Sequence, residues 1–419
     1  MTLSEICPSK DIFLKFHFKS ESLVLSSYIA SQNTTDITTR YIWYNQRSVH
    51  FGIKVGGYNH SKYFVHFGIK VGGCNHSEYL VHDKDIVHFG IKSPCEDSPC
   101  KNGDCVIVYH KPYFHCACTA GFTGQTCSAA LAPFKFTTLG ASGRTGPVSL
   151  GSHYQGKAHG HVTVVNGIQH WTVDVTGKYR IEAVGASGGY ESSSSYQTRA
   201  YRSRGARITG SFDLSKGDVI RILVGQEGGI NTVSSTSGGG GGSFVAKGNT
   251  PLIVAGGGGG YDDANTRHAT CDASTSTSGN SGYGGSVWPG GTGGNGATST
   301  SSSHVGGGGG GFYTDGSSGS NFGGAYGPGG EGGKAFLNGG VGGRSVWNGV
   351  PGGFGGGGGV WGNGGGGGGG GGYSGGGSGN PHYYACGGGG GSYNSGSDQR
   401  AECCFNDAGH GYVQVSLIG

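Results

Sequence analysis

The sequence has little charge, little proline and no long apolar run, and each shortage excludes a class of protein. Charged residues make up 12% of the 419 residues and the net charge is +4. No Lys/Arg block or Arg-Gly-Gly repeat is present, so we predict no nucleic-acid partner. No apolar run is long enough for a membrane-spanning helix, so we predict none. Proline numbers 11 against 97 glycines, without a Gly-X-Y period, which excludes collagen.

Motifs that carry catalytic chemistry are missing as well. No phosphate-binding Gly-x4-Gly-Lys-Ser/Thr loop is present. Matches to Gly-x-Gly-x-x-Gly and Gly-x-Ser-x-Gly fall in glycine-rich sequence, without the βαβ or strand-to-helix context that gives them meaning. His410 stands between two glycines with no acid or nucleophile beside it, and Asp262 and Asp263 have the pattern of a solvated loop. We therefore predict no enzymatic activity and no cofactor.

The N-terminal stretch, residues 1–93, combines repeats with weak structural signals. Val-His-Phe-Gly-Ile-Lys occurs at Val49–Lys54, Val65–Lys70 and Val87–Lys92, and the first two copies extend further, as for a strand and a turn. So few full copies rarely form a stable stack, so we expect an irregular, low-order segment. Its histidines lack the short spacing of a zinc site. Three sequons are potential glycan sites: Asn33, Asn59 and Asn75.

The first residues do not resemble a secretory signal. Met1–Ser20 contains neither an apolar core nor a small-residue cleavage site. We expect that the chain is a fragment or that its start is misassigned, with unconventional secretion as the remaining alternative. Cys7 and Cys74 in this part either pair or stay free.

Six cysteines crowd into residues 95–127 with short, regular spacing. They follow the pattern Cys95-x4-Cys100-x4-Cys105-x10-Cys116-x-Cys118-x8-Cys127. So short a segment cannot bury enough apolar surface to fold unaided, so the pattern predicts disulfides formed in an oxidising compartment. Spacing alone leaves about fifteen pairings open. A zinc site is not favoured, because paired Cys-x2-Cys knuckles are absent.

With the sequence Thr-Ala-Gly-Phe-Thr-Gly at Thr119–Gly124, this spacing resembles an epidermal-growth-factor-like (EGF-like) module over residues 94–128. Calcium-binding members of that family carry acidic and amide residues before the first cysteine. This chain has Ile91-Lys92-Ser93-Pro94 there, so we predict no calcium. The resemblance implies three disulfides: Cys95–Cys105, Cys100–Cys116 and Cys118–Cys127.

Residues 134–255 are rich in strand patterns. Apolar residues alternate in Tyr179–Val184, whereas Val219–Val224 is almost continuously apolar, as for a strand buried on both faces. Short strands separated by Gly, Asp and Asn turns predict a sandwich or jelly roll, with no helix beyond single turns. The candidate strands are Phe134–Thr138, His161–Val165, His170–Val175, Tyr179–Val184, Ala206–Phe212, Val219–Val224, Ser243–Ala246, Leu252–Ala255 and, near the C-terminus, Tyr412–Ile418.

A glycine tract, residues 238–396, interrupts these strands. An isolated glycine tract is disordered, because glycine loses the most backbone freedom on folding. A β-domain on both sides can hold it, and polyproline-II helices without side chains can pack and hydrogen-bond laterally. We therefore favour an ordered bundle over a floppy insertion. The aromatic residues that break the tract are expected to fill gaps or make contacts rather than bind a cofactor: Tyr283, Trp288, Phe312, Tyr326, Trp347, Phe354, Trp361 and Tyr373.

Two strand phrases, Trp171–Gly189 and Leu214–Gly228, together with the glycine tract and Gly409–Val415, resemble the glycine-rich extracellular domain of the anaplastic lymphoma kinase and leukocyte tyrosine kinase receptors. The resemblance implies, for residues 131–419, a tumour-necrosis-factor-like β-sandwich with polyglycine helices inserted between its later strands. In those receptors the EGF-like module follows the glycine-rich domain. Here it precedes that domain, and no membrane span or kinase occurs before the chain ends.

Four cysteines remain in and after the glycine tract: Cys271, Cys386, Cys403 and Cys404. We do not expect the neighbours Cys403 and Cys404 to bond each other, because such a ring is strained. Bridges to Cys271 and Cys386 are then expected. We favour Cys386–Cys403 with Cys271–Cys404, the other arrangement and a metal site being the alternatives.

The sequence thus predicts a mostly β, disulfide-stapled and non-enzymatic protein, extracellular or at the cell surface, without a metal. Its expected role is protein recognition or adhesion, with a protein ligand or a matrix component as its partner. One alternative is an ectodomain fragment of a receptor tyrosine kinase of the anaplastic lymphoma kinase type. The other is a structural matrix or adhesive glycine-rich protein, including one that binds ice.

Overall fold

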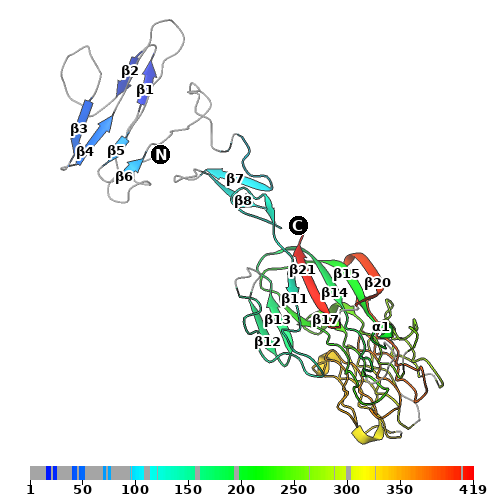
Figure 1. The fold of residues 1–419 in the computed structure, drawn as a ribbon. Coiled ribbons are helices and arrows are strands. Elements are labelled where there is room, and N and C mark those ends of the chain that lie inside the picture. The colour runs from blue at the N-terminus through cyan, green and yellow to red at the C-terminus, as the bar shows by residue number, and fades with distance from the viewer. Residues whose placement is uncertain are drawn as a thin grey trace. The chain divides into compact units, whose positions relative to one another are not determined.

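The computed structural model describes six strands within residues 16–76 and most of residues 95–419 (Figure 1). The gaps in the second range are residues 96, 108–113, 120, 156–160, 193–197, 264, 287, 299–302, 326 and 407–408. The chain divides into two compact units, residues 1–97 with 108–113, and residues 98–107 with 114–419. None of the described helices is long and apolar enough to cross a bilayer.

The first unit contains a hairpin and an antiparallel four-stranded sheet in the order β3-β4-β5-β6. Val49 of β4 lies opposite Val71 of β5, so the first two copies of the repeat supply neighbouring strands. The strands here are short, and most of residues 1–93 lie outside the described residues, so the expected low-order segment stays a prediction. Its strands are β1 (Phe16–Lys19), β2 (Ser22–Leu25), β3 (Arg40–Tyr44), β4 (Arg47–Phe51), β5 (Ile69–Val71) and β6 (Cys74–His76).

The second unit begins within the six-cysteine segment and contains five of its cysteines, Cys95 being assigned to the first unit. Strands β7 (Gly103–Ile107) and β8 (Phe114–Cys118) form an antiparallel hairpin, followed by the short pair β9 (Phe122–Thr123) and β10 (Ala129–Ala130). Disulfides join Cys100 to Cys116 and Cys118 to Cys127, and Cys95 and Cys105 are also disulfide-bonded. These bonds are compatible with the pairing that the EGF-like resemblance implies.

Two antiparallel sheets then form a β-sandwich. One sheet has the order β11-β21-β14-β15-β20 and the other β12-β13-β16-β17-β18-β19. The strands are β11 (Phe134–Phe136), β12 (Val162–Val165), β13 (Ile168–Thr172), β14 (Gly177–Val184), β15 (Gly205–Leu214), β16 (Val219–Leu223), β17 (Ser243–Lys247), β18 (Thr250–Ala255), β19 (Tyr393–Asn394), β20 (Ser397–Asn406) and β21 (Tyr412–Leu417).

Every strand predicted between Phe134 and the C-terminus is present, within a few residues at each end. Strands β19 and β20 were not predicted. The helical elements among the described residues are single turns, as expected: α1 (Thr198–Tyr201) and the 3-10 turns η2 (Ser320–Phe322) and η3 (Phe336–Asn338).

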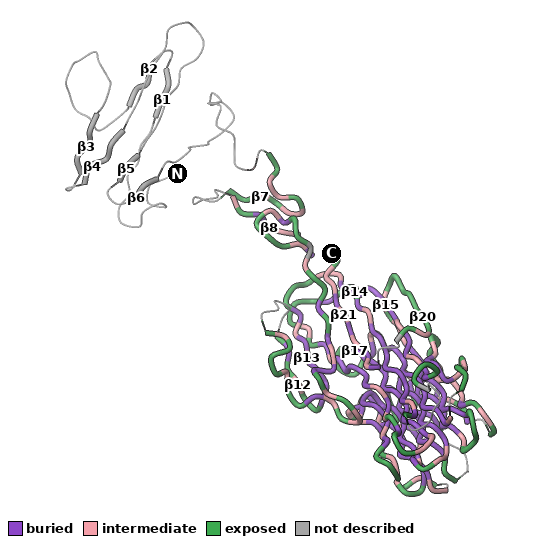
Figure 2. The backbone as a smooth tube through the Cα atoms, viewed as in Figure 1, coloured by how far each residue is buried: buried purple, intermediate pink, exposed green. Residues whose placement is uncertain are grey.

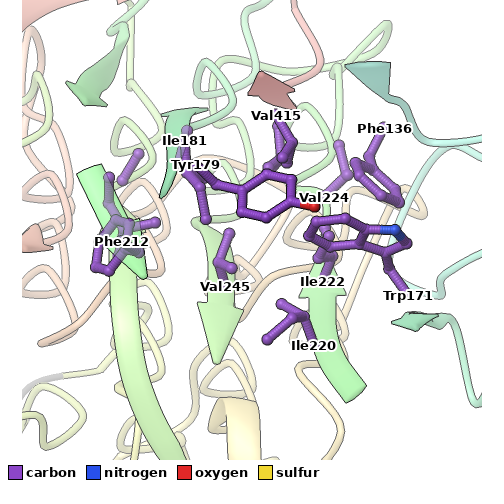
Figure 3. Packing of buried hydrophobic residues seen from close by; sticks show 14 of the residues in the cluster. Phe136, Trp171, Tyr179, Ile181, Phe212, Ile220, Ile222, Val224, Val245 and Val415 are labelled. Carbon is purple, nitrogen blue, oxygen red and sulfur yellow. The ribbon is translucent and has the colours of Figure 1, made fainter. Parts of the chain in front are cut away.

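Alternating side chains build the sandwich core between the two sheets (Figure 3). Trp171 and Tyr179 lie edge to face there, with ring centroids 5.5 Å apart. Ile220 and Ile222 of β16 point into this core, whereas Leu223 belongs to a second buried cluster on the other side of the same sheet. The prediction that Val219–Val224 is a strand is confirmed, but burial on both faces holds only at its end, because Val219 is exposed and Arg221 half-buried.

The second cluster joins the sandwich to the glycine-rich insertion between β18 and β19, residues 256–392, which we call the glycine block. Three buried phenylalanines from the block, Phe312, Phe336 and Phe354, pack against Leu223 and Phe244 of the sheet. Phe336 stacks on Phe244 with ring centroids 5.1 Å apart. The block therefore shares an apolar core with the sandwich.

Backbone hydrogen bonds between separate glycine segments hold the interior of the block. The N–H of Gly257 donates to the carbonyl of Gly371 at 2.8 Å, and the N–H of Gly371 donates to Gly240 at 2.9 Å. A Cβ added at Gly369 would overlap the carbonyl oxygen of Gly376, and many other glycines are equally enclosed. Figure 2 shows that this interior is buried. The tract is therefore ordered by lateral backbone bonding and is not a floppy insertion, whereas the polyproline-II conformation of its segments stays a prediction.

Candidate protein-recognition surface

Some aromatic side chains of the glycine block are buried, and others are exposed to solvent. Trp288, Phe312 and Phe354 are buried and fill space between glycine segments. Trp347 is 54% exposed and Tyr283 is 42% exposed. The half-buried members are Trp361 and Tyr373, and Tyr326 lies outside the described residues. The sequence therefore located the aromatic residues without separating the two roles, because spacing in a glycine tract has no period that marks a buried face.

The exposed Trp347 is held by its neighbours. Its ring lies edge-on to Trp361 at 6.3 Å, and the ring of Trp361 lies 4.5 Å from that of His304. The backbone N–H of Trp347 donates to the carbonyl of Trp361 at 2.9 Å. The indole is thus presented from a braced backbone, with one side packed and the other open to solvent.

Tyr383 and Tyr384 form a second exposed pair, 71% and 51% accessible. The loop that carries them ends at Cys386, which is disulfide-bonded to Cys271 and pairs through its backbone with Tyr283. The carbonyl of Ala385 also accepts the N–H of Asp262 at 2.8 Å. The two tyrosine rings therefore project from a loop whose far end is fixed.

The two aromatic groups lie on adjoining segments of the block. The N–H of Gly366 donates to the carbonyl of His304 at 2.8 Å, and the N–H of Gly306 donates to Gly379 at 3.2 Å. The segment His304–Gly306 therefore contacts both the segment after Trp361 and the segment that leads to Tyr383. Large aromatic side chains on an ordered backbone are typical of protein interfaces.

The last four cysteines pair differently from our expectation. Cys271 bonds Cys386, and the neighbours Cys403 and Cys404 bond each other. The expected pairs Cys386–Cys403 and Cys271–Cys404 are therefore wrong. The segment Gly259–Tyr261 explains the difference, because Gly259 donates its N–H to the carbonyl of Cys271 while Tyr261 pairs with Cys386. That segment brings the two cysteines together inside the block, whereas Cys403 is exposed on β20.

The acidic pair Asp262–Asp263 is not simply solvated. Asp262 is only 4% exposed. Burial raises the pKa of Asp262 to about 7, the charges of Asp263 and Glu191 add to the rise, and a hydrogen bond with Ser235 opposes it. The expectation of a solvated loop is therefore wrong for Asp262. Its burial depends on segments far away in the chain, which no local pattern reveals.

His410 has a structural environment. Its Nδ1 accepts the backbone N–H of Glu227 at 3.0 Å, and burial lowers the pKa of the imidazole. Glu227 in turn accepts a hydrogen bond from Arg202 at 2.8 Å. His410 therefore links the start of β21 to the segment after β16.

Sequence reasoning missed an ion-pair network that clamps the block. Arg344 donates to both carboxylate oxygens of Glu331, at 2.7 and 3.0 Å, and Arg144 lies 3.6 Å from the same group. Burial opposes ionisation of Glu331, but the hydrogen bonds and charge of Arg344, with the charge of Arg144, outweigh it and lower its pKa. Nothing in the sequence near these residues indicates the pairing.

Of the remaining predicted sites, Asn33, Asn59 and Cys7 lie outside the described residues, and Cys74 and Asn75 begin strand β6. The sequence predicted no metal site. Among the described residues, one group of side chains has the spacing to hold a metal ion: ligand atoms of Asp272, Cys403 and Cys404 all lie within 4.8 Å of one another.

Comparison with known proteins shows a partial similarity to a receptor. No protein-family model matches the chain. The leukocyte tyrosine kinase receptor of Mus musculus is 37% identical over 102 residues, which are 23% of this chain and 11% of that receptor. The similar part thus spans about a tenth of the receptor's length. It supports a receptor-like extracellular region in this chain.

Proposed function

We propose that this chain is an extracellular or cell-surface protein-recognition protein without catalytic activity of its own. In this proposal the glycine block is a rigid platform, and the exposed rings of Trp347, Tyr383 and Tyr384 contact a protein ligand. The observation that carries it is the exposure of these large rings on backbone that is itself hydrogen-bonded and buried. The bonded cysteines and the similarity to a receptor support the extracellular setting.

The rigidity of the platform favours binding. Association costs side-chain and loop ordering at the interface, and a platform that is already ordered reduces that cost. Trp and Tyr are enriched among the residues that dominate interface energies, because each buries a large area and has a polar atom at its edge. Trp347 and the tyrosine pair supply both properties.

The test is labelling on intact cells with the full chain fused to a peroxidase, which marks proteins that it touches. The variant Trp347→Ala/Tyr383→Ala/Tyr384→Ala is expected to label its principal surface protein at least tenfold less, as for removal of hot-spot residues. A control variant, Val148→Ala/Tyr201→Ala, removes exposed apolar side chains elsewhere and should label as the unchanged chain does. Equal labelling by the aromatic variant would contradict the proposal.

A second candidate function is the ligand-binding ectodomain of a receptor tyrosine kinase. The similarity to the mouse receptor favours it. The full-length transcript distinguishes the two, because a membrane span and a kinase domain encoded downstream of Gly419 would support the receptor. A stop codon directly after Gly419, with a signal peptide upstream, would support a secreted recognition protein.

A further inference from the structure

A cluster of reactive side chains lies where β20, the edge strand of the five-stranded sheet, approaches Asp272. We propose that Cys403, Cys404 and Asp272 form a zinc site that becomes available when the Cys403–Cys404 disulfide is reduced. The ligand atoms of these three residues lie within 4.8 Å of one another. The proposal is independent of the aromatic recognition surface.

The geometry suits zinc. Zinc binds thiolate sulfur at about 2.3 Å and carboxylate oxygen at about 2.0–2.2 Å. Ligand atoms around a tetrahedral ion of that size are roughly 3.5 Å apart. The three atoms here lie within 4.8 Å of one another, which is near that spacing. Three protein ligands leave a fourth position for water, as in open zinc sites.

Hydrogen bonds already hold the carboxylate of Asp272 in one orientation, as a metal-ligating carboxylate requires. Asp272 is 3% exposed, and its Oδ1 accepts the backbone N–H of Arg204 at 2.7 Å. Its Oδ2 accepts from the Arg267 guanidinium at 2.9 Å. Partners of this kind fix a ligating carboxylate and tune its affinity. Two thiolates and a carboxylate exceed the charge of a zinc ion by one negative charge, which Arg267 would balance.

The Cys403–Cys404 bond contributes little to the stability of the fold. Disulfides stabilise mainly by closing long loops in the unfolded chain, and a bond between sequence neighbours closes none. Strand β20 is held in the sheet by its pairing with β15, where Arg207 forms an ion pair with Glu402 and stacks on Phe405 at 3.9 Å. The strand therefore keeps its place without the bond.

Accessibility favours reduction of the Cys403–Cys404 bond over the Cys271–Cys386 bond of the glycine block. Cys403 is exposed and Cys404 is half-buried, whereas Cys271 and Cys386 are fully buried. Two molecules of a small thiol reductant supply two electrons and two protons, so the Cys403–Cys404 bond breaks, two protein thiols form and the reductant becomes a disulfide. Zinc then displaces both thiol protons to solvent.

The experiment treats the full chain with reduced glutathione and titrates it with zinc against a chromophoric chelator. Mass spectrometry after alkylation should show modified Cys403 and Cys404 with Cys271–Cys386 intact. We expect one more equivalent of bound zinc in the reduced chain than in equally treated Cys403→Ser/Cys404→Ser, and no such difference before reduction. The double variant corrects for zinc held by other thiols. Equal zinc in the two reduced proteins, or the same excess in the oxidised chain, overturns the proposal.

Variants of the third ligand and its partner separate a built site from a simple dithiol. Asp272→Asn is expected to weaken zinc binding at least tenfold, and Arg267→Gln by about 10- to 100-fold. Because Asp272 is buried, circular dichroism must first show that its variant is folded, and Arg267, which is partly exposed, provides the second test. Cobalt substitution should give thiolate charge-transfer bands that are altered in Asp272→Asn. Unchanged affinity and spectra in both variants overturn the proposal.

Discussion

The β-sandwich and the glycine block are ordered by opposite means. In the sandwich, alternating side chains such as Ile181, Ile222 and Trp171 are buried between two sheets, and backbone hydrogen bonds join neighbouring strands. In the block, backbone bonds join segments far apart in the sequence, and the interior is mostly glycine backbone with a few buried side chains such as Trp288. The first arrangement gains free energy from apolar burial, whereas the second depends on satisfying every buried backbone group.

The comparison teaches how a glycine tract can be ordered despite its entropy. Glycine loses more freedom on folding than any other residue, so the block needs anchors outside its own backbone. It has a disulfide, Cys271–Cys386, and the three phenylalanines that pack on the sandwich sheet. Perturbing an anchor should therefore loosen the block and leave the sandwich folded.

The largest effect is expected from removal of the disulfide inside the block. Cys271 and Cys386 are 115 residues apart, and closing a loop of that size contributes roughly 4–5 kcal/mol. In Cys271→Ala/Cys386→Ala, hydrogen–deuterium exchange should show lost protection in the glycine segments while β14, β15 and β21 stay protected. The matched control Cys403→Ser/Cys404→Ser opens no long loop and should leave exchange unchanged. Loss of protection in both regions together would mean that they unfold as one unit.

A slightly smaller effect is expected from an apolar anchor. Phe312 and Phe136 are both fully buried, the first between block and sheet and the second in the sandwich core. Replacing either by Ala should cost about 3–5 kcal/mol of unfolding free energy, from lost burial and the cavity that remains. Chemical denaturation measures the cost, and exchange locates it. Phe312→Ala should deprotect the block first and Phe136→Ala the sandwich, so identical exchange patterns would remove the distinction between the two regions.

Glycine substitutions sharpen the comparison further. Gly369→Ala places a Cβ onto the carbonyl of Gly376 inside the block, so we expect a loss of at least about 3 kcal/mol. Gly217→Ala lies in the turn before β16, where φ is +90° and an added Cβ meets nothing within 4 Å. Its cost should be that of a left-handed backbone alone, about 1–2 kcal/mol. Equal melting temperatures for the two variants would argue against a close-packed block.

The two regions also differ in how far the sequence predicts them. The strands from Phe134 to Ala255 and the last strand follow from alternation and turn residues, which are local signals. Strand β20 was missed because Ser397–Asn406 is largely polar and takes its place by pairing with β15 at the edge of the sheet. The order of the block followed from its β-rich flanks rather than from any period within it.

The candidate site was less predictable for the same physical reason. The burial of aromatic residues in the block depends on segments that lie far away in the chain, as Tyr261 pairs with Cys386. The burial of Asp262 likewise depends on its bond to Ala385. Because a ring between adjacent cysteines is strained, we did not expect the Cys403–Cys404 bond. The structure shows that Cys271 bonds Cys386, which leaves Cys403 and Cys404 to bond each other. Residue types were available from the sequence, whereas their partners were not.

The smallest of these effects is a pH dependence confined to the block. The pKa of Asp262 is about 7 in the folded chain, against an ordinary value of 3.8. A raised pKa means that the folded state binds the proton more tightly, so this contribution is complete below pH 4 and is lost as pH rises through 7. Between pH 5 and pH 8 the unfolding free energy of the block should fall by roughly 2–3 kcal/mol. Urea denaturation followed by the fluorescence of the tryptophans checks this.

Asp262→Asn keeps the shape and removes the titration, so its stability should stay nearly flat over the same pH range apart from other groups. Lys247→Ala is the control in the sandwich, because it removes the exposed ion-pair partner of Asp218. The pKa of Asp218 is lowered, so this carboxyl does not titrate between pH 5 and pH 8, and the variant should keep the pH profile of the unchanged chain. If Asp262→Asn retains the fall in stability between pH 5 and pH 8, the buried carboxyl is not its source. If exchange shows the fall in the sandwich strands as well, the two regions respond to Asp262 as one folding unit.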